Sequence, residues 1–173
     1  MGAPNNDGGG TYSGHVRIYE NNNGTWTQIG SDIDGEGSSD YFGWSVSLSA
    51  DGSVLAIGGI YDDGASYDAG HVRIYENNNG TWTQIGSDID GEAADDASGN
   101  SVSLSYDGST VAIGAYDNDG NGSSSGHVRI YQNIAGTWTK TAEDIDGEAA
   151  NDNSGWAVTV SYTHLTLPTS DLV

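Results

Sequence analysis

A stretch of 23 residues, GHVRIYENNNGTWTQIGSDIDGE, occurs at 14–36 and again, without a change, at 70–92. A third copy at 126–148 keeps 16 of the 23 residues, so the period is 56 residues. A period of this length is typical of folds that stack one supersecondary unit several times. The flanking sequence repeats in step, which predicts repeat units over 1–42 (partial), 43–98, 99–154 and 155–161 (partial).

Within one repeat, four short segments have the pattern of β-strands. HVRIYE at 15–20 alternates apolar and polar residues, and the Asn-Gly that follows is a hairpin signal before TWTQIGSDI at 25–33. WSVSLS at 44–49 alternates as well, and an Asp-Gly turn joins it to VLAIGG at 54–59, whose composition indicates a strand buried on both faces. No segment has a helical apolar period. We therefore predict an all-β fold of four-stranded antiparallel blades, a partial β-propeller with about three blades.

The charge of the chain excludes several classes of partner. Its 25 acidic and 4 basic residues give a formal net charge of −21, which repels nucleic acid and anionic membranes. There is no cysteine, and no apolar run approaches the roughly 18 residues that a membrane span needs, so we expect no membrane insertion. No phosphate-binding loop, nucleophile elbow or zinc-protease motif is present, and we predict that the chain is not an enzyme.

The order GWSVSLS, LAIGG or VAIGA, loop and GHVRIY resembles the FG-GAP repeat, over residues 1 to about 161. The pair FG stands at 42–43 and the triplet GAP at 2–4. The resemblance implies the propeller of integrin α-subunits and of many secreted microbial proteins. It also implies an extracellular or cell-surface module for binding or adhesion, with protein or glycan ligands at a cell surface or matrix. The family's calcium loop is not carried over, because the connection at 50–52 is too short to surround a calcium ion.

Two other groups of oxygen-bearing side chains are candidate calcium sites, so Ca²⁺ is a candidate cofactor. The loop DNDGNG at 117–122 places Asp117, Asp119 and Asn121 at the alternate positions of a calcium-binding loop. The alternative for both groups is a solvated turn whose side chains hydrogen-bond to turn amides. The second group consists of acidic residues that recur in each repeat: Asp34, Glu36, Asp40, Asp90, Glu92, Asp96, Asp146, Glu148 and Asp152.

Three other residue types recur once or more in each repeat, and we expect structural roles for them. The histidines are expected to pack within strands, and the arginines to pair with carboxylates or stack on aromatic rings. The tryptophans are expected to pack between blades, with a carbohydrate-binding surface as the alternative. Another alternative is that the chain is the scaffold part of a larger secreted enzyme. The residues are His15, His71, His127, Arg17, Arg73, Arg129, Trp26, Trp82, Trp138, Trp44 and Trp156.

The two ends of the repeat array carry their own predictions. VSYTHLTLPT at 160–169 resembles a translated sequencing-library adapter, so the non-repeat tail at 162–173 is expected to be artefactual; a natural, divergent terminus is the alternative. A partial propeller leaves the faces of its terminal blades uncovered, which predicts marginal stability or self-association.

Overall fold

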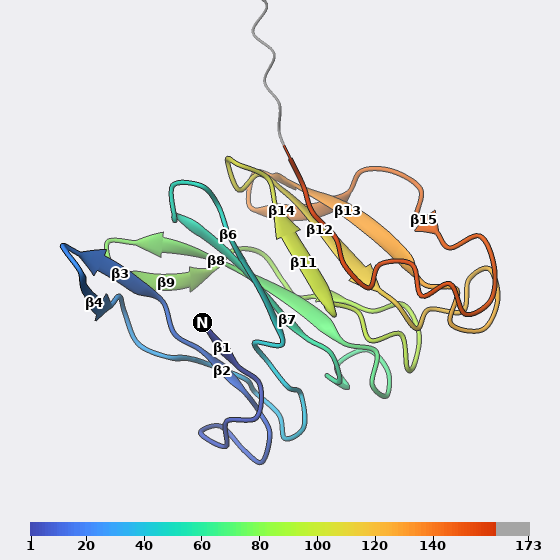
Figure 1. Cartoon of the computed structure of the whole chain (residues 1–173), viewed down its shortest axis with the longest axis horizontal. Coiled ribbons are helices and arrows are strands. Elements are labelled where there is room, and N and C mark those ends of the chain that lie inside the picture. The colour runs from blue at the N-terminus through green and yellow to red at the C-terminus, as the bar shows by residue number, and fades with distance from the viewer. Residues whose placement is uncertain (162–173) are drawn as a thin grey trace, which may run out of the picture.

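The computed structural model describes residues 1–161 (Figure 1). Every regular element in this part of the chain is a β-strand, so it contains no helix long and apolar enough to cross a membrane. The all-β prediction is confirmed. The adapter-like tail at 162–173 lies outside the described residues, and its artefactual origin stays a prediction.

Two five-stranded antiparallel sheets follow the same plan, and we call them blade 2 and blade 3. In blade 2, β8 pairs with β7 along one edge and with both β9 and β10 along the other, while β6 pairs with β7. Blade 3 repeats these pairings. Blade 2 consists of β6 (Ser45–Leu48), β7 (Val54–Gly59), β8 (His71–Asn78), β9 (Thr81–Gln84) and β10 (Ile89–Asp90). Blade 3 consists of β11 (Ser101–Leu104), β12 (Thr110–Ala115), β13 (His127–Ile134), β14 (Thr137–Lys140) and β15 (Ile145–Asp146).

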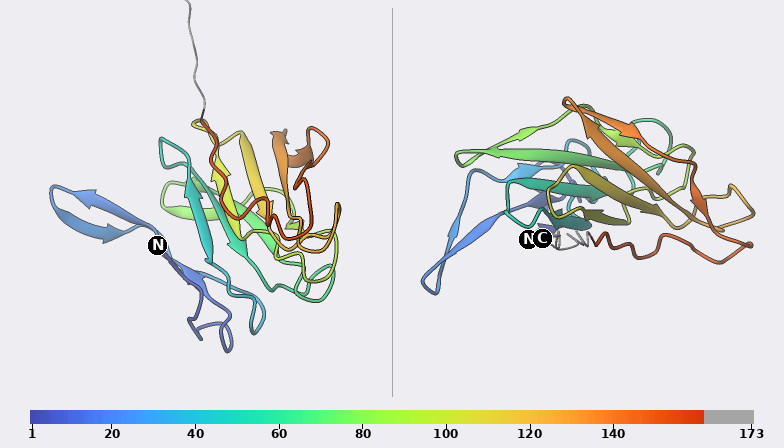
Figure 2. Two further views of the ribbon diagram at one scale, coloured as in Figure 1. Left: turned by 45° about the vertical axis from the view of Figure 1, so that its right-hand side comes forward. Right: turned by 90° about the horizontal axis from the view of Figure 1, so that it is seen from above.

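Blade 1 has the same plan without a counterpart of β6 among the described residues. It consists of β1 (Gly2–Ala3), β2 (His15–Val16), β3 (Tyr19–Asn22), β4 (Thr25–Gln28) and β5 (Ile33–Asp34). The strand β2 pairs with β1 and β5, and β3 forms a hairpin with β4. The three blades lie side by side in the order of the sequence (Figure 2). The described part of the chain is therefore a propeller-type array of two five-stranded blades and one partial blade.

The sequence predicted one continuous strand over 25–33, and this is wrong. The strand β4 ends at Gln28, and the next regular strand on this edge is β5. Between them, Gly30 has a φ of +76°, a left-handed conformation that glycine adopts without steric cost. The amide of Ile29 still donates to the carbonyl of Ile18, so the interruption is a bulge within one edge strand. This bulge places Asp32 beside Arg17, which lies between β2 and β3.

The hydrophobic core lies between adjacent blades. The middle strands β7 and β12 are buried along nearly their whole length, as the apolar sequence of 54–59 predicted. Between blades 1 and 2 the core residues are Val16, Ile18, Ile33, Phe42, Leu55 and Ile57. Between blades 2 and 3 they are Ala56, Val72, Ile74, Ile89, Val102, Leu104, Val111 and Ile113. Each blade thus covers the face that its neighbour cannot bury alone.

Serine side chains join the first strands of successive blades. The hydroxyl of Ser45 donates to the carbonyl of Gly99 at 2.7 Å, and the hydroxyl oxygen of Ser47 accepts the amide of Leu104 at 3.0 Å. The same bonds recur one repeat later, from Ser101 to Gly155 (2.7 Å) and from Val160 to Ser103 (2.9 Å). The alternating serines of WSVSLS therefore satisfy backbone groups of the next repeat.

The tryptophan of the fourth strand also belongs to the contact between blades. The indole of Trp82 donates to the carbonyl of Ile29 at 3.3 Å, and the indole of Trp138 donates to the carbonyl of Ile85 at 3.1 Å. Trp26, at the same position of blade 1, is 66% exposed because no described blade precedes it. The prediction of packing between blades is confirmed for Trp82 and Trp138, whose indole N–H groups donate to carbonyl groups of the preceding blade.

An apolar groove opens where blades 1 and 2 meet, at the place that a counterpart of β6 would occupy in blade 1. Val46 and Leu48 are 39% and 48% exposed there, whereas the equivalent Val102 and Leu104 of blade 3 are 8% and 5% exposed. The whole lining consists of Met1, Ile18, Tyr19, Trp26, Val46, Ser47, Leu48 and Leu55.

We predict that two copies of the chain associate through this groove, because association removes its apolar surface from water. Sedimentation velocity should show a mass that rises with protein concentration, and Leu48→Gln should shift the protein toward the monomer. Ile134→Gln is the matched control, since Ile134 is at least as exposed as Leu48 (56% against 48%) but lies on the blade 3 hairpin. A wild-type protein that stays monomeric at all concentrations would contradict the prediction.

Candidate functional site

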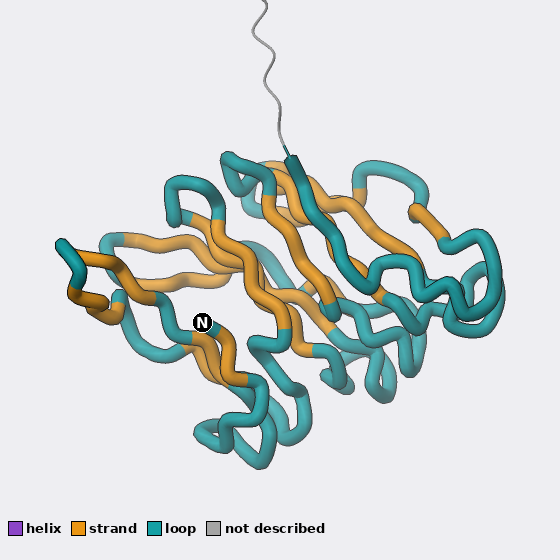
Figure 3. The backbone as a smooth tube through the Cα atoms, viewed as in Figure 1, coloured by secondary structure: helices purple, strands orange, loops and turns teal. Residues whose placement is uncertain are grey.

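The long loops of the blades gather at one end, which we call the loop end (lower edge of Figure 3), and the short Asp-Gly turns lie at the other. In blade 2 the loop between β7 and β8 is joined to the loop after β10 by backbone bonds from Asp95 to Tyr67 and from Ser98 to Ala69, both 2.9 Å. Backbone bonds from Asn151 to Ser123 (2.8 Å) and from Ser154 to Ser125 (2.9 Å) join the corresponding loops of blade 3, so the loop of the first predicted calcium group lies beside a loop that carries the second. In blade 3 the side-chain amide of Asn121 donates to the carbonyl of Gly147 at 3.2 Å, across the two loops.

Within the first predicted calcium group, the middle aspartate closes its own loop. The carboxylate of Asp119 accepts the amide of Ser124 at 2.7 Å. The equivalent residues Asp7 and Asp63 accept amides five residues on, both at 2.8 Å. This explains why the aspartate recurs in all three copies without requiring a metal. Calcium binding by Asp117, Asp119 and Asn121 stays a prediction.

The second predicted group divides into three kinds of position. Asp40, Asp96 and Asp152 each accept the amide of the residue three positions earlier, at 2.6, 3.0 and 2.8 Å. Glu36 and Glu92 reach the next blade and pair with its arginine, whereas Glu148 is exposed after blade 3. Asp34, Asp90 and Asp146 end their short strands directly opposite His15, His71 and His127. Side-chain caps account for the first kind, and ion pairs account for Glu36 and Glu92.

The position of the integrin-type calcium loop does not fit a calcium ion in this chain. One carboxylate oxygen of Asp51 accepts the hydroxyls of Ser49 (2.7 Å) and Ser53 (2.8 Å) and the amide of Ser53 (3.0 Å). These hydrogen bonds, led by the Ser53 amide, lower the pKa of Asp51 to about 2. The turn thus offers a single carboxylate that already caps its own backbone, whereas calcium takes six to eight oxygen ligands.

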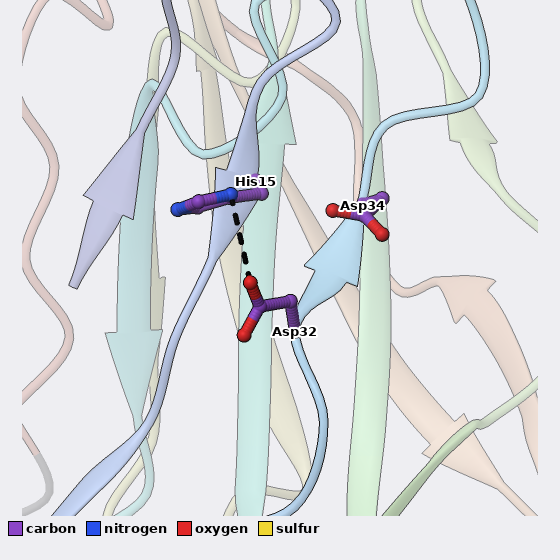
Figure 4. Close-up of side chains that lie close together, drawn as sticks. All are labelled: His15, Asp32 and Asp34. Atoms are coloured by element: carbon purple, nitrogen blue, oxygen red, sulfur yellow. Dashed lines mark ion pairs between the residues drawn. The ribbon is translucent and has the colours of Figure 1, made fainter. Parts of the chain in front are cut away.

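A histidine and two carboxylates meet in blade 1, with ligand atoms all within 4.8 Å of one another (Figure 4). His15 lies on β2, Asp34 on β5, and Asp32 in the bulge between β4 and β5; the His15 Nδ1 atom is 3.9 Å from an oxygen of Asp32. Glu92, from the loop after blade 2, forms a comparable group with His127 and Asp144 of blade 3. Sequence reasoning treated the histidines as packing residues and missed these groups, because the bulge that turns Asp32 inward has no clear signal in the sequence.

An arginine already serves as the cation of each group. Both Nε and Nη2 of Arg17 donate to one oxygen of Asp32, at 2.9 and 2.7 Å, and Gln28 donates to the other at 2.7 Å. The hydrogen bond from Arg17 is the main cause that lowers the pKa of Asp32 to about 2. In blade 3, Arg129 pairs with both Glu92 and Asp144. The prediction that the arginines pair with carboxylates is confirmed, and these two groups are ion-pair networks.

Four aromatic side chains form a surface at the loop end, which we call the aromatic patch. Tyr12 and Tyr41 are stacked with ring centroids 5.6 Å apart, and Tyr41 makes edge contacts with Trp44 (6.5 Å) and Tyr61 (5.4 Å). Tyr12, Trp44 and Tyr61 are exposed at the surface. The sequence indicated Trp44 alone, because the tyrosines come from three separate loops that meet only in the folded chain. Tyr116, in the loop between β12 and β13, makes an edge contact with Trp156, which follows β15, with centroids 4.6 Å apart.

Comparison with known proteins adds one finding. Residues 31–75 match the family model of the FG-GAP repeat. The match runs from the end of blade 1 through β6 and β7 into β8, and most of this segment has a counterpart one period later. A search of curated proteins gave no match.

Proposed function

We propose that this chain, whose residues 31–75 match the FG-GAP repeat and whose described part has an all-β fold of the propeller type, is part of a non-catalytic module that binds protein or glycan ligands outside the cell. FG-GAP repeats suggest propeller modules, which are often extracellular and typically non-catalytic. The observation that carries the proposal is the aromatic patch at the loop end, where Tyr12, Tyr41, Trp44 and Tyr61 contact one another at the surface.

The patch has the properties of a recognition surface. Tyr and Trp are enriched at the energetic centres of protein interfaces, because each combines a large rigid apolar area with a polar tip. The indole N–H of Trp44 is already paired with the side-chain oxygen of Asn100 at 3.2 Å. The ring face of Trp44 can therefore be covered by a ligand without leaving its polar group unpaired.

A carbohydrate ligand is the second candidate, and one observation favours it. Of the recurring tryptophans, Trp82 and Trp138 are used between blades, but Trp44 and Trp156 are exposed at the loop end. Flat aromatic faces suit the apolar faces of sugar rings, and the neighbouring Asp and Asn side chains suit their hydroxyl groups. The carbohydrate alternative thus depends on Trp44 and Trp156. The fourth-strand tryptophans Trp82 and Trp138 do not contribute to it.

The proposal is tested by measuring binding to an oligosaccharide array and to immobilised extracellular-matrix proteins. We expect wild-type protein to bind one of the two surfaces and Trp44→Ala to weaken that binding by about tenfold or more, as for an aromatic hot spot. Tyr106→Ala is the matched control, because Tyr106 is a highly exposed aromatic residue in the β11–β12 turn, at the opposite end of the blade. Absence of binding to both surfaces, or equal binding by Trp44→Ala, would refute the proposed role of the patch.

Calcium assistance is part of the same proposal, and it is supported by the exposed carboxylates of Asp34, Asp90 and Asp146 at the loop end. Repeating the binding measurement with chelator and with calcium, at fixed ionic strength, tests it. Binding that is lost with chelator and restored by calcium supports the assisting role, and binding that is equal in both contradicts it.

A further inference from the structure

The first strands of blades 2 and 3 lie next to each other, and one hydrogen bond fixes their register (Figure 1). The two strands, β6 and β11, have the same sequence, SVSL. The amide of Leu104 in β11 donates to the hydroxyl oxygen of Ser47 in β6 at 3.0 Å. Val102 and Leu104 are buried in this contact. Blade 2 therefore covers the first strand of blade 3, and β11 contacts both β6 and β7.

The strand β6 lacks this cover. Val46 and Leu48 are exposed, whereas their equivalents in β11 are buried. They line the apolar groove between blades 1 and 2, whose volume is about 590 Å³. The described part of blade 1 has no counterpart of Ser47, so the amide of Leu48 lacks the acceptor that the amide of Leu104 has. An exposed strand edge beside an apolar surface is a template for association with another strand.

Residues 155–161 carry the missing element at the other end of the array. This segment, GWAVTVS, is the third copy of the sequence that contains β6 and β11, and it lies against β11 through the serine bonds of blade 3. No strand of the described chain pairs with it. The side chains of Ala157 and Thr159 are exposed. They occupy the positions of Ser45 and Ser47, which are half-buried because blade 3 covers them.

We propose that the chain assembles head to tail, with residues 155–161 of one copy docked along β6 of the next copy, at the groove between blades 1 and 2. Thr159 then stands where Ser47 stands within the chain, and its hydroxyl oxygen accepts the amide of Leu48. The contact joins two different surfaces, and each copy carries both. Contacts of this kind produce rings or open chains of copies, whereas a contact between two identical surfaces produces a symmetric pair.

The charge of the protein opposes this association only at long range. The chain has a formal net charge of −21, so two copies repel each other in low salt. The segments that meet, 44–48 and 155–161, contain no charged residue, so docking brings no like charges into contact. Association is therefore expected to be stronger at about 0.15 M salt, where the Debye length is about 8 Å, than in dilute buffer.

The test is sedimentation velocity of the whole chain at several protein concentrations, for the wild type and two variants. Thr159→Glu places a charge on the docking strand, and Leu48→Gln removes apolar surface from β6, so each should lower the observed mass to that of the monomer. Both side chains are exposed, and circular dichroism should show an unchanged β-sheet spectrum. Thr139→Glu is the matched control, because Thr139 is an exposed threonine on β14; it should associate like the wild type.

An equimolar mixture of the two variants is the deciding measurement. The Thr159→Glu protein keeps an intact β6 surface, and the Leu48→Gln protein keeps an intact segment 155–161, so the mixture should regain at least the mass of a dimer. A contact between two grooves predicts instead that Thr159→Glu associates like the wild type and that mixing restores nothing. Either of these results, or a wild-type protein that stays monomeric at every concentration, would overturn the proposal.

Discussion

Gly58→Ala is expected to destabilise the chain by about 3 kcal/mol or more, at the upper end of the cost of overpacking. A Cβ atom on Gly58 would collide with the carbonyl oxygen of Gly99 in the segment that leads into blade 3, and would lie 2.6 Å from the Ser45 hydroxyl. The carbonyl cannot move away easily, because it accepts the hydrogen bond of Ser45. The substitution therefore forces blades 2 and 3 apart. Their separation disrupts the packing of the hydrophobic core that they share.

Urea denaturation followed by circular dichroism measures this effect. Gly80→Ala is the control, because nothing lies within 4 Å of a Cβ at Gly80 and only its φ of +89° opposes a side chain, at a cost of about 1 kcal/mol. Gly114→Ala should behave like Gly58→Ala, since its Cβ would meet the carbonyl of Gly155. Equal losses for Gly58→Ala and Gly80→Ala would mean that close approach of the blades is not what requires glycine.

Arg73→Met is expected to cost about 3 kcal/mol, the lower end of the range for breaking a buried ion pair. The guanidinium is 5% exposed, joins Asp88 of its own blade to Glu36 of blade 1, and lies 5.6 Å from the centre of the Phe42 ring. Its removal leaves two carboxylates without their cation. The expected loss of stability lies at the lower end of that range because both carboxylates remain in contact with water. The side chain of Glu36 is the more exposed of the two.

Arg17→Met is the matched control for this prediction, because Arg17 lies in the same 23-residue sequence of the first copy. Its side chain is 39% exposed and pairs with Asp32 alone, so we expect a loss within about 1 kcal/mol. Chemical denaturation of both variants at two salt concentrations measures the difference. If both variants lost the same free energy of unfolding, the location of Arg73 between two blades would add nothing to its contribution to stability.

Several features of the fold follow from local sequence alone. Strand β7 has the predicted bounds 54–59, because a short apolar run between an Asp-Gly turn and glycines has few other conformations. The hairpins β3–β4 and β8–β9 follow from Asn-Gly turns with positive φ at both residues. The bulge after Gln28 was missed, because it depends on how the edge strand fits its neighbour.

The candidate sites could be predicted only in part. The acidic residues of the loops were evident from their recurrence, but the aromatic patch and the packing of His71 against Phe42 were not. Tyr12, Tyr41 and Tyr61 belong to different loops, and Phe42 and His71 are brought together across two blades. Such contacts depend on the docking of one repeat against the next, and no local pattern encodes the distance between them.

By itself, the sequence determined the 56-residue period, the strands within it and the all-β class, since these depend on local alternation and turn chemistry. Only the tertiary structure decided which contacts the residues of each copy make and how deeply they are buried. Residues 14–36 and 70–92 are identical, yet Trp26 is exposed where Trp82 packs, and Arg17 is half-exposed where Arg73 is buried. The physical reason is that a blade buries its faces only against neighbouring blades. Identical residues therefore have different environments, depending on which blades lie beside them.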